Sequence, residues 1–516
     1  MMPSSDHSFD EQPALGSFLD GRLDDGQLND GQTDRPDKPE EACGVFGIYA
    51  PQEDVAKLTY FGLYGLQHRG QESAGIAVFE GNQVHLHKEM GLVAQVFSEQ
   101  ILAEMTGTLA VGHTRYSTTG SSRVVNAQPA LVETRLGKLA LAHNGNLVNT
   151  PALREELLET GVQLNTTTDS EMIAIAIAQA INKGKGWLDG AISAFCRCQG
   201  AFSLAIATPE GIMGARDPNG IRPLVIGTLD SEIPGEPLRY VLSSETCALD
   251  IIGADYLRDV APGELVWITE TGLESFQWAT PEKRKLCIFE MIYFARPDSI
   301  MHDESLYSYR MRIGRQLALE APAEVDVIIG VPDSGIPAAI GFSQASGIPY
   351  AEGLIKNRYV GRTFIQPTQH MRESGIRMKL NPLKDVLFGK RILVVDDSIV
   401  RGTTSRKLVK ALRDAGATEV HMRISSPPVT HPCFYGIDTD NQDQLIGATK
   451  TVEEIGQQIG VDSLAYLSLE GMLTTTQDDT ESFCSACFTG DYPVPVPELV
   501  KRSKLMLEKL VPTVPA

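Results

Sequence analysis

Short apolar runs separated by polar or glycine-containing turns dominate residues 43–275. Runs of this length, bounded by turn residues, predict β-strands. The strands are expected at 43–50, 73–79, 84–87, 109–112, 139–142, 202–207, 223–226, 240–243 and 264–268. Helical spacing of apolar residues appears at 151–159 and 171–181. Because strands outnumber helices, this half is predicted to be α+β with stacked sheets, ending near residues 276–285.

The second half alternates more regularly between strands and helices. Short apolar strands are expected at 325–330, 391–395 and 419–424, with helices at 336–346 and 404–415. Alternation of this kind predicts an α/β domain with a parallel, doubly wound sheet. The chain after Asp438 is predicted to be helical but less regular, and no internal repeat of fixed period is found.

Length and composition indicate how the chain is divided into domains. A chain of 516 residues exceeds what one hydrophobic core usually supports. Residues 1–42 hold 11 acidic and 3 basic side chains without any sustained period, so they are expected to be a disordered or removable leader. We therefore predict a first domain at 43–275, a second domain at 276–480 and a tail at 481–516.

The charge distribution limits the classes of partner. A net charge of −21 argues against general nucleic-acid binding, and no apolar run is long enough to span a membrane. The N-terminus lacks the layout of a signal peptide, so a cytoplasmic protein is expected. Residues 356–413, however, carry 14 Lys and Arg against 4 acids. This basic stretch indicates either solvated helix faces or a site for a small polyanion.

The most specific segment is RILVVDDSIVRGTT at 391–404. An apolar strand ends in Asp396 and Asp397, and a turn with glycine and hydroxyl side chains leads into a helix. Such a loop lies where open α/β sheets bind ligands, and its N–H groups can surround a phosphate. The alternative is an ordinary helix cap or solvated turn.

The segment resembles the PRPP (5-phosphoribosyl 1-diphosphate) signature of type I phosphoribosyltransferases. The resemblance implies that the two carboxylates contact ribose hydroxyls and that residues 398–404 hold the 5-phosphate, through Ser398, Arg401, Gly402, Thr403 and Thr404.

Two further loops support a phosphate site. The strand at 325–331 ends in Pro-Asp333-Ser334-Gly, which in that family holds pyrophosphate and Mg²⁺; taken alone it is equally a plain strand–helix turn. One Mg²⁺ per subunit is expected near Ser334, Asp396 and Asp397, bound weakly without substrate phosphates. The basic loop that starts at Lys356 is either a surface hairpin or a lid that closes on pyrophosphate, through Lys356, Arg358 and Arg362.

A second chemistry is indicated by Cys43, which stands at the start of the first predicted strand. Most cysteines of this kind are small buried core residues. If residues 1–42 are removed, however, the α-amine of Cys43 becomes free. With an ordinary pKa of about 7.7–8.0 it can serve as the general base for its own thiol.

Motifs downstream favour the catalytic alternative. GLQHRGQESAG (65–75), GHTRYST (112–118) and AHNG (142–145) resemble those of class II glutamine amidotransferases. These belong to the N-terminal nucleophile hydrolases, which fold as a four-layer αββα sandwich. The resemblance implies that Arg115 binds the glutamine carboxylate and that Asp169, with Thr118 nearby, binds its ammonium group. It also implies that Asn144 and the N–H of Gly145 form the oxyanion hole.

Together the two halves resemble the amidophosphoribosyltransferases, over about residues 43–490. EMIYFARPDS, LIKNRYVGRTFIQP, VVDDSIVRGTTSRKL and ISSPPVTHPCFYGID carry this resemblance. It implies the reaction glutamine + PRPP + water → 5-phosphoribosylamine + pyrophosphate + glutamate, the first step of purine synthesis, with ammonia passed between two sites. Feedback inhibition by purine nucleotides and a homotetramer are expected from the same family. The alternatives are a glucosamine-6-phosphate synthase, an asparagine synthetase and a regulator that has lost activity. The sequence after residue 280 shows neither sugar-isomerase repeats nor an ATP-binding SGG-type loop, and a regulator should lack Cys43 or Asp396.

Eight cysteines are too few for a disulfide scaffold in a chain of this length. The pair Cys484-x-x-Cys487 is open to metal binding, redox chemistry or chance, and its spacing does not separate zinc from iron–sulfur. The resemblance to the cluster-bearing branch of the family implies one [4Fe–4S] cluster held by Cys287, Cys433, Cys484 and Cys487. Cys196, Cys198 and Cys247 are expected to be core residues.

Overall fold

The computed structural model describes residues 43–116, 122–230, 239–357, 380–439, 441–498 and 500. These residues all fall within one compact unit of the chain, Pro36–Ala516. No helix in these ranges is long and apolar enough to cross a membrane.

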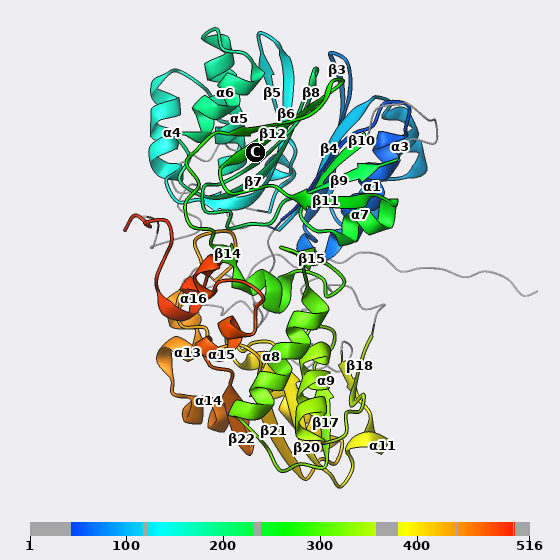
Figure 1. Cartoon of the computed structure of the whole chain (residues 1–516), viewed down its shortest axis with the longest axis vertical. Coiled ribbons are helices and arrows are strands. Elements are labelled where there is room, and N and C mark those ends of the chain that lie inside the picture. The colour runs from blue at the N-terminus through cyan, green and yellow to red at the C-terminus, as the bar shows by residue number, and fades with distance from the viewer. Residues whose placement is uncertain are drawn as a thin grey trace, which may run out of the picture. The chain divides into compact units, whose positions relative to one another are not determined.

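Two antiparallel sheets form the first half (Figure 1). The seven-stranded sheet has the order β11 (Asp255–Asp259), β9 (Val225–Leu229), β10 (Arg239–Ser243), β1 (Gly44–Tyr49), β4 (Leu109–Arg115), β2 (Ser73–Glu80) and β3 (Gln83–Met90). The six-stranded sheet has the order β13 (Gly272–Gln277), β12 (Glu264–Thr269), β8 (Gly211–Arg216), β7 (Gly200–Thr208), β6 (Gly137–Leu147) and β5 (Ala130–Thr134). Small and branched side chains such as Val45, Ala142 and Ile226 fill the space between the sheets.

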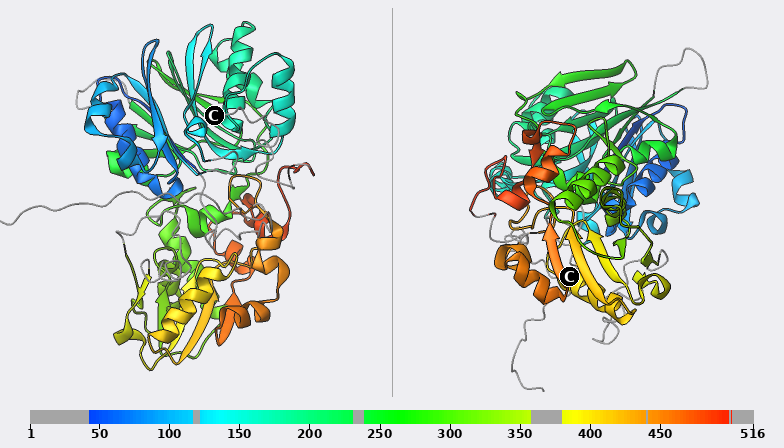
Figure 2. Two further views of the ribbon diagram at one scale, coloured as in Figure 1. Left: turned by 180° about the vertical axis from the view of Figure 1, so that it is seen from behind. Right: turned by 60° about the horizontal axis from the view of Figure 1, so that its bottom comes forward.

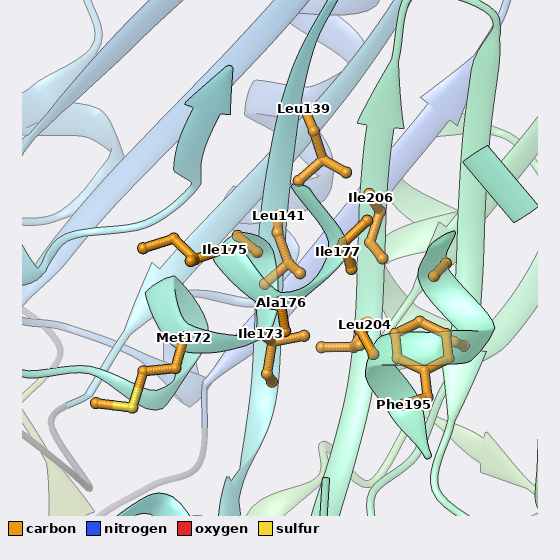
Figure 3. Packing of buried hydrophobic residues seen from close by; sticks show 14 of the residues in the cluster. Leu139, Leu141, Met172, Ile173, Ile175, Ala176, Ile177, Phe195, Leu204 and Ile206 are labelled. Atoms are coloured by element: carbon orange, nitrogen blue, oxygen red, sulfur yellow. The ribbon is translucent and has the colours of Figure 1, made fainter. Parts of the chain in front are cut away.

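Helices cover the outer face of each sheet. α1 (Val55–Gly65), α2 (Val93–Val96), α3 (Glu99–Glu104) and α7 (Cys247–Ile252) contribute to a core with the first sheet, and α4 (Thr150–Glu159), α5 (Asp169–Asn182) and α6 (Trp187–Phe195) to a core with the second. Figure 3 shows Ile173 and Ile177 of α5 against Leu141 and Leu204 of the sheet. The layer order is therefore αββα, which confirms the predicted fold class of this half.

The second half is built on a four-stranded parallel sheet, as predicted. Its order is β17 (Val327–Gly330), β20 (Arg391–Asp396), β21 (Glu419–Ile424) and β22 (Ser463–Tyr466). α8 (Leu306–Glu320) and α9 (Gly335–Ser346) pack on one face, and α12 (Thr403–Asp414) and α14 (Val452–Ile459) on the other (Figures 1 and 2). Alternate residues of β20 enter the two cores, Leu393 on the first face and Ile392 on the second, as in a doubly wound sheet.

Short elements complete the chain. They are η1 (Gln67–Arg69), η2 (Val124–Asn126), β14 (Leu286–Cys287), η3 (Glu290–Phe294), β15 (Ile300–Met301), β16 (Glu304–Ser305), β18 (Leu354–Lys356), β19 (Leu380–Pro382), α11 (Lys384–Leu387), η4 (Gln442–Gln444), α13 (Ile446–Thr449), α15 (Leu469–Thr474), η5 (Thr480–Ser482), β23 (Phe483–Cys484) and α16 (Ala486–Thr489). β23 pairs in parallel with β14, so the tail attaches to the start of the second half.

Most expected elements exist, and their ends differ from the prediction by at most three residues, except that the strand expected at 139–142 continues to Leu147. The expected strand at 325–330 begins at Val327, and the expected helix at 171–181 begins at Asp169. After Asp438, where a helical but less regular region was expected, the chain also forms two strands: β22 extends the parallel sheet beside β21, and β23 pairs with β14. The longer elements that were not predicted include α1, α6, α8, β5, β8, β11 and β13.

Candidate functional site

Cys43 lies directly before β1, a central strand of the seven-stranded sheet. Its side chain is buried, and its Sγ donates to the carbonyl oxygen of Tyr116 at 3.4 Å. A small pocket opens beside the thiol. The residues that line it are Cys43, Arg115, Tyr116, Gln128, His143, Gly145, Thr168, Asp169 and Ser170. Of the predicted glutaminase residues, the structure thus brings Cys43, Arg115, Gly145 and Asp169 together around one cavity.

Opposite charges meet in this pocket. Arg115 ends β4, and its Nη1 lies 3.9 Å from Glu72 Oε2. Asp169 begins α5, accepts the Leu147 N–H at 3.0 Å and lies 3.5 Å from His143 Nδ1. Burial opposes ionisation of Asp169, but His143 and these hydrogen bonds hold its pKa below the ordinary value. A fixed cation and a fixed anion suit the carboxylate and ammonium groups of a free amino acid.

Asn144 is the most unusual polar residue of the pocket region. It is fully buried in β6, and among the described residues neither Oδ1 nor Nδ2 has a hydrogen-bond partner. Burying an unpaired amide costs free energy, so such a group usually serves a ligand. The neighbouring Gly145 has φ +149°, and a Cβ there would lie 2.1 Å from the Ala201 carbonyl oxygen. Only glycine fits at this position of the strand.

The thiol is poorly ionised in its present surroundings. Burial raises the pKa of Cys43 to about 12, and the opposing effect of Arg115 is smaller. Since the thiolate is the nucleophile, the site needs a base close to the sulfur. His143 lines the same pocket, but its Nδ1 is within hydrogen-bonding distance of Ser170 Oγ, at 3.3 Å.

Sequence reasoning missed several lining residues, and Thr118 lies outside the described residues. Three of them are direct sequence neighbours of Asn144 or Asp169, and this adjacency could have identified them. They are His143, Thr168 and Ser170. Gln128 could not be identified in this way, because it lies neither in nor next to any of the motifs. Its side-chain oxygen accepts the backbone N–H of His143 at 2.8 Å and so fixes the strand that carries Asn144.

A second group of polar residues lies where β17 and β20 end. Ser334 Oγ donates to Asp397 Oδ2 at 2.5 Å, and Ser398 Oγ donates to Asp397 Oδ1 at 2.7 Å. Asp396 and Asp397 are buried, and the Asp397 N–H binds Asp396 Oδ1 at 2.9 Å. The loops approach closely, since a Cβ on Gly335 would lie 2.6 Å from the Val395 carbonyl oxygen. The structure therefore joins the two loops that the sequence suggested separately.

The remaining predicted residues lie around this group. α12 begins at Thr403, so the turn from Ser398 to Gly402 leads into the N-terminus of a helix, a position that favours phosphate. Lys356 reaches Asp333 Oδ2 at 2.5 Å, which places the first residue of the basic loop beside the loop after β17. Arg358 and Arg362 lie outside the described residues.

Four cysteines gather at the junction of the halves. Cys287 and Cys484 are register partners in the β14–β23 pair, and Cys433 and Cys487 belong to the same hydrophobic cluster. Burial raises the pKa of Cys487 well above its ordinary value, and the other three sulfurs raise it further. In the described ranges no three His, Cys, Asp or Glu side chains form a group arranged to hold a metal ion. Cys247 is buried as expected, whereas Cys198 is only partly buried and Cys196 is exposed, which makes the expectation of a core residue wrong for Cys196.

Comparison with known proteins agrees with the two-site geometry. A model of the glutamine amidotransferase domain matches residues 113–250, and a model of the phosphoribosyl transferase domain matches residues 304–425. An amidophosphoribosyltransferase of Synechococcus elongatus is 73% identical over 92% of this chain and 96% of its own length. One from Mycobacterium tuberculosis is 49% identical over 92% of this chain and 90% of its own length.

Solved structures give the same result. A glutamine PRPP amidotransferase of Bacillus subtilis, complexed with ADP and GMP, is 47% identical and superposes with a TM-score of 0.82. It covers 88% of this chain and 98% of its own. A structure described as the allosteric regulatory enzyme of purine biosynthesis has a TM-score of 0.83 at 47% identity, over 88% of this chain and 97% of its own.

Proposed function

Since the chain belongs to the amidophosphoribosyltransferase family, we propose that it converts glutamine, PRPP and water into 5-phosphoribosylamine, pyrophosphate and glutamate. This is the committing step of purine nucleotide synthesis. The observation that carries the proposal is the pocket in which the Cys43 thiol meets Arg115, Asp169 and Gly145.

The first half-reaction releases ammonia. Cys43 Sγ attacks the side-chain carbonyl carbon of glutamine while Arg115 and Asp169 hold the α-carboxylate and α-ammonium groups. The oxygen that gains charge is bound by Asn144 Nδ2 and the Gly145 N–H. The thiol proton passes through the base to the departing nitrogen, so ammonia leaves and a thioester remains. Water then hydrolyses the thioester to glutamate and restores the thiol.

We propose that the base is the α-amine of Cys43, set free when residues 1–42 are removed. The high pKa of the buried thiol supports this, because the sulfur needs a proton acceptor and the terminal amine is attached to the same Cα. N-terminal sequencing of active enzyme should therefore begin at Cys43. Glutaminase activity in a chain that still begins at Met1 would refute the proposal.

The second half-reaction takes place at the acid pair. Asp396 and Asp397 accept hydrogen bonds from the ribose hydroxyls, and the turn from Ser398 to Thr404 holds the 5-phosphate. Ammonia attacks C1 of the ribose as pyrophosphate departs. An all-oxygen donor set, Ser334 and the two carboxylates, suits Mg²⁺, which would neutralise charge on the leaving pyrophosphate. We propose that Lys356, Arg358 and Arg362 bind the same pyrophosphate group.

A contact across the halves supports direct transfer of ammonia. Asn146 Nδ2 donates to the Phe434 carbonyl oxygen at 3.0 Å, and Gly436 packs against the backbone of Gly145. The strand that carries the oxyanion residues therefore abuts the second half. Direct transfer at this junction would keep neutral ammonia out of bulk water, where it would become protonated.

One assay tests the whole proposal. Purified protein should release pyrophosphate from PRPP only when glutamine or ammonia is supplied. Cys43→Ala should abolish turnover with glutamine and preserve turnover with ammonia. Loss of both activities in a folded variant, or pyrophosphate release that needs neither nitrogen source, would refute a two-site mechanism.

For the cysteines we propose a [4Fe–4S] cluster held by Cys287, Cys433, Cys484 and Cys487. Four sulfurs gathered at the junction of the halves support it, since thiolates are the ligands of such clusters. Its role is structural, to attach the tail to both halves. Anaerobically purified protein should be brown and contain about four iron atoms per chain. Stoichiometric zinc would contradict the proposal.

Further properties are carried over from the family as proposals. Purine nucleotides are the expected feedback inhibitors, supported by the relative that holds ADP and GMP. A homotetramer in the cytoplasm is also proposed, together with domain boundaries at 42/43, 275/276 and 480/481. Inhibition assays with AMP, ADP and GMP, and the mass in solution, test the first two.

A further inference from the structure

Four charged side chains form a buried ion cluster between the two halves, here called the Arg69 cluster: Arg69, Arg222, Glu245 and Glu290. Each is at most 1% exposed. Arg69 Nη2 lies 2.6 Å from Glu290 Oε1, Arg222 Nη2 lies 2.6 Å from the same oxygen, and Arg69 Nη1 binds Glu245. Two guanidinium groups face two carboxylates, as a buried ion group requires, and His68 Nε2 also lies 2.6 Å from Glu245 Oε1.

The Arg69 cluster reaches the nucleophile through one hydrogen bond. Arg69 Nε donates to the carbonyl oxygen of Cys43 at 3.2 Å. That bond fixes the peptide plane after Cys43. On the strand side, Ser244 Oγ accepts the N–H of Val45 at 3.0 Å. These two hydrogen bonds set the orientation of the Cys43 side chain. The Arg69 guanidinium can hold the Cys43 carbonyl oxygen only while its other two nitrogens are held by carboxylates.

Glu290 comes from the second half and is itself held firmly. It begins the π-helical turn η3, whose Met291 and Ile292 lie in the hydrophobic core beside α8 and β17. Arg310 of α8 donates from Nε to the Met291 carbonyl at 2.8 Å and from Nη2 to the Ala295 carbonyl at 2.6 Å. Single π-helical turns often occur at functional sites.

The bonding is reciprocal across the halves. Glu245 belongs to the first half, and its Oε2 accepts the Arg296 N–H at 2.9 Å and the Ser299 hydroxyl at 2.7 Å. Both donors lie in the segment that follows η3. Each half therefore supplies a carboxylate that the other half needs.

We infer that Glu290 is a positioning residue for Cys43, supplied to the glutaminase pocket by the phosphoribosyltransferase half. The inference rests on the proposed function and specifies which residue outside the pocket keeps the nucleophile in attack geometry. Glu290 acts by holding the Arg69 guanidinium against the Cys43 carbonyl oxygen. It touches neither substrate, so its loss changes the rate of glutamine cleavage and leaves glutamine affinity intact.

The test compares Glu290→Gln and Glu290→Asp with Glu264→Gln as a matched control. Glu264 is likewise buried and ion-paired, to Arg258 at 2.7 Å, but no bond joins that pair to Cys43 among the contacts of the described chain. Full-length enzyme is assayed with glutamine and separately with ammonia, so that ammonia-driven turnover reports a folded second site. Glu290→Gln should lower kcat with glutamine about 10- to 100-fold. KM for glutamine and the ammonia-driven rate should stay within about threefold.

Glu290→Asp keeps the charge and should recover part of the lost kcat, to a value between those of wild type and Glu290→Gln. If Glu290→Gln yields no folded protein, Glu290→Asp decides alone, with an expected loss of about threefold or more that is confined to kcat with glutamine. Unchanged kcat, a proportional loss of both activities in soluble protein, or the same effect in Glu264→Gln would overturn the inference. A wild-type enzyme that does not use glutamine at all would instead refute the proposed function.

Discussion

Replacement of Asn144 by alanine should damage catalysis without damaging the fold. The side chain is fully buried, and no described residue bonds to either of its polar atoms. Leaving an amide unpaired in the interior costs about 1–3 kcal/mol, which the truncation relieves. The cavity left by the removed atoms costs about 1 kcal/mol in return. The net effect on the free energy of unfolding is therefore close to zero or favourable by up to about 2 kcal/mol.

The rate of glutamine cleavage should fall in the same variant, although its free energy of unfolding does not. Loss of one oxyanion donor lowers kcat by about 10²- to 10³-fold, or roughly 2.7–4 kcal/mol of transition-state stabilisation. The assay measures glutamate release at saturating glutamine and PRPP, and urea denaturation measures stability. Ammonia-driven turnover should not change.

Asn149 provides the control for this experiment. Its Nδ2 donates to the Arg197 carbonyl at 2.8 Å, and its Oδ1 accepts the Gln199 N–H at 2.9 Å. Asn149→Ala should lose about 1–2 kcal/mol of stability and keep the glutaminase rate. If Asn144→Ala is destabilised as much as Asn149→Ala, or if its kcat stays within about threefold of wild type, the assignment of Asn144 to the oxyanion hole is wrong.

Three further outcomes are expected. Burial lowers the pKa of His113 to about 3, against an ordinary 6.5, so its contribution to stability is complete above pH 6.5 and is lost as the pH falls towards 3. His113→Gln should remove about 1.4 kcal/mol per pH unit from the slope of the free energy of unfolding below pH 6.5, measured by urea denaturation, and an unchanged slope would contradict this. Ser334→Ala removes the 2.5 Å hydrogen bond to Asp397 and should raise KM for PRPP about tenfold with ammonia as nitrogen donor, whereas a normal KM would exclude Ser334 from the site. Cys487→Ser should lower the iron content of anaerobically purified protein, while the exposed Cys196→Ser should not.

The sequence predicted the elements whose signal is local. β20 has four apolar residues before an acid pair, and that pattern located both the strand and the edge of the sheet where the loops after β17 and β20 meet. The spacing of apolar residues likewise located α5, whose isoleucines all enter one core. Asp169 was assigned from its motif, and the structure places it at the first position of that helix. Where one strand or helix face decides the outcome, sequence reasoning was sufficient.

Elements that depend on distant partners were missed. α1 contains two glycines, and Gly62 is required because a Cβ there would lie 2.2 Å from the ring of Phe46. Packing against β1 therefore overrides weak helix propensity. β22 has only four residues and becomes a strand because β21 offers a free edge. Gln128 and Glu290 could not be assigned to the nucleophile, since their contacts span 15 and 221 residues of sequence.

The two clusters that the fold places at the junction act on the glutaminase pocket at different points. Cys433 is followed within three residues by Phe434, whose carbonyl binds Asn146, and by Gly436, which packs on Gly145. Cys433 shares one hydrophobic cluster with Cys287 and Cys484. A group that binds these cysteines would therefore also hold residues 434–436 in place against β6. The Arg69 cluster meanwhile fixes the Cys43 carbonyl. If the proposed roles hold, nucleophile and oxyanion hole each depend on the second half, and glutamine cleavage should require that both halves be folded and joined.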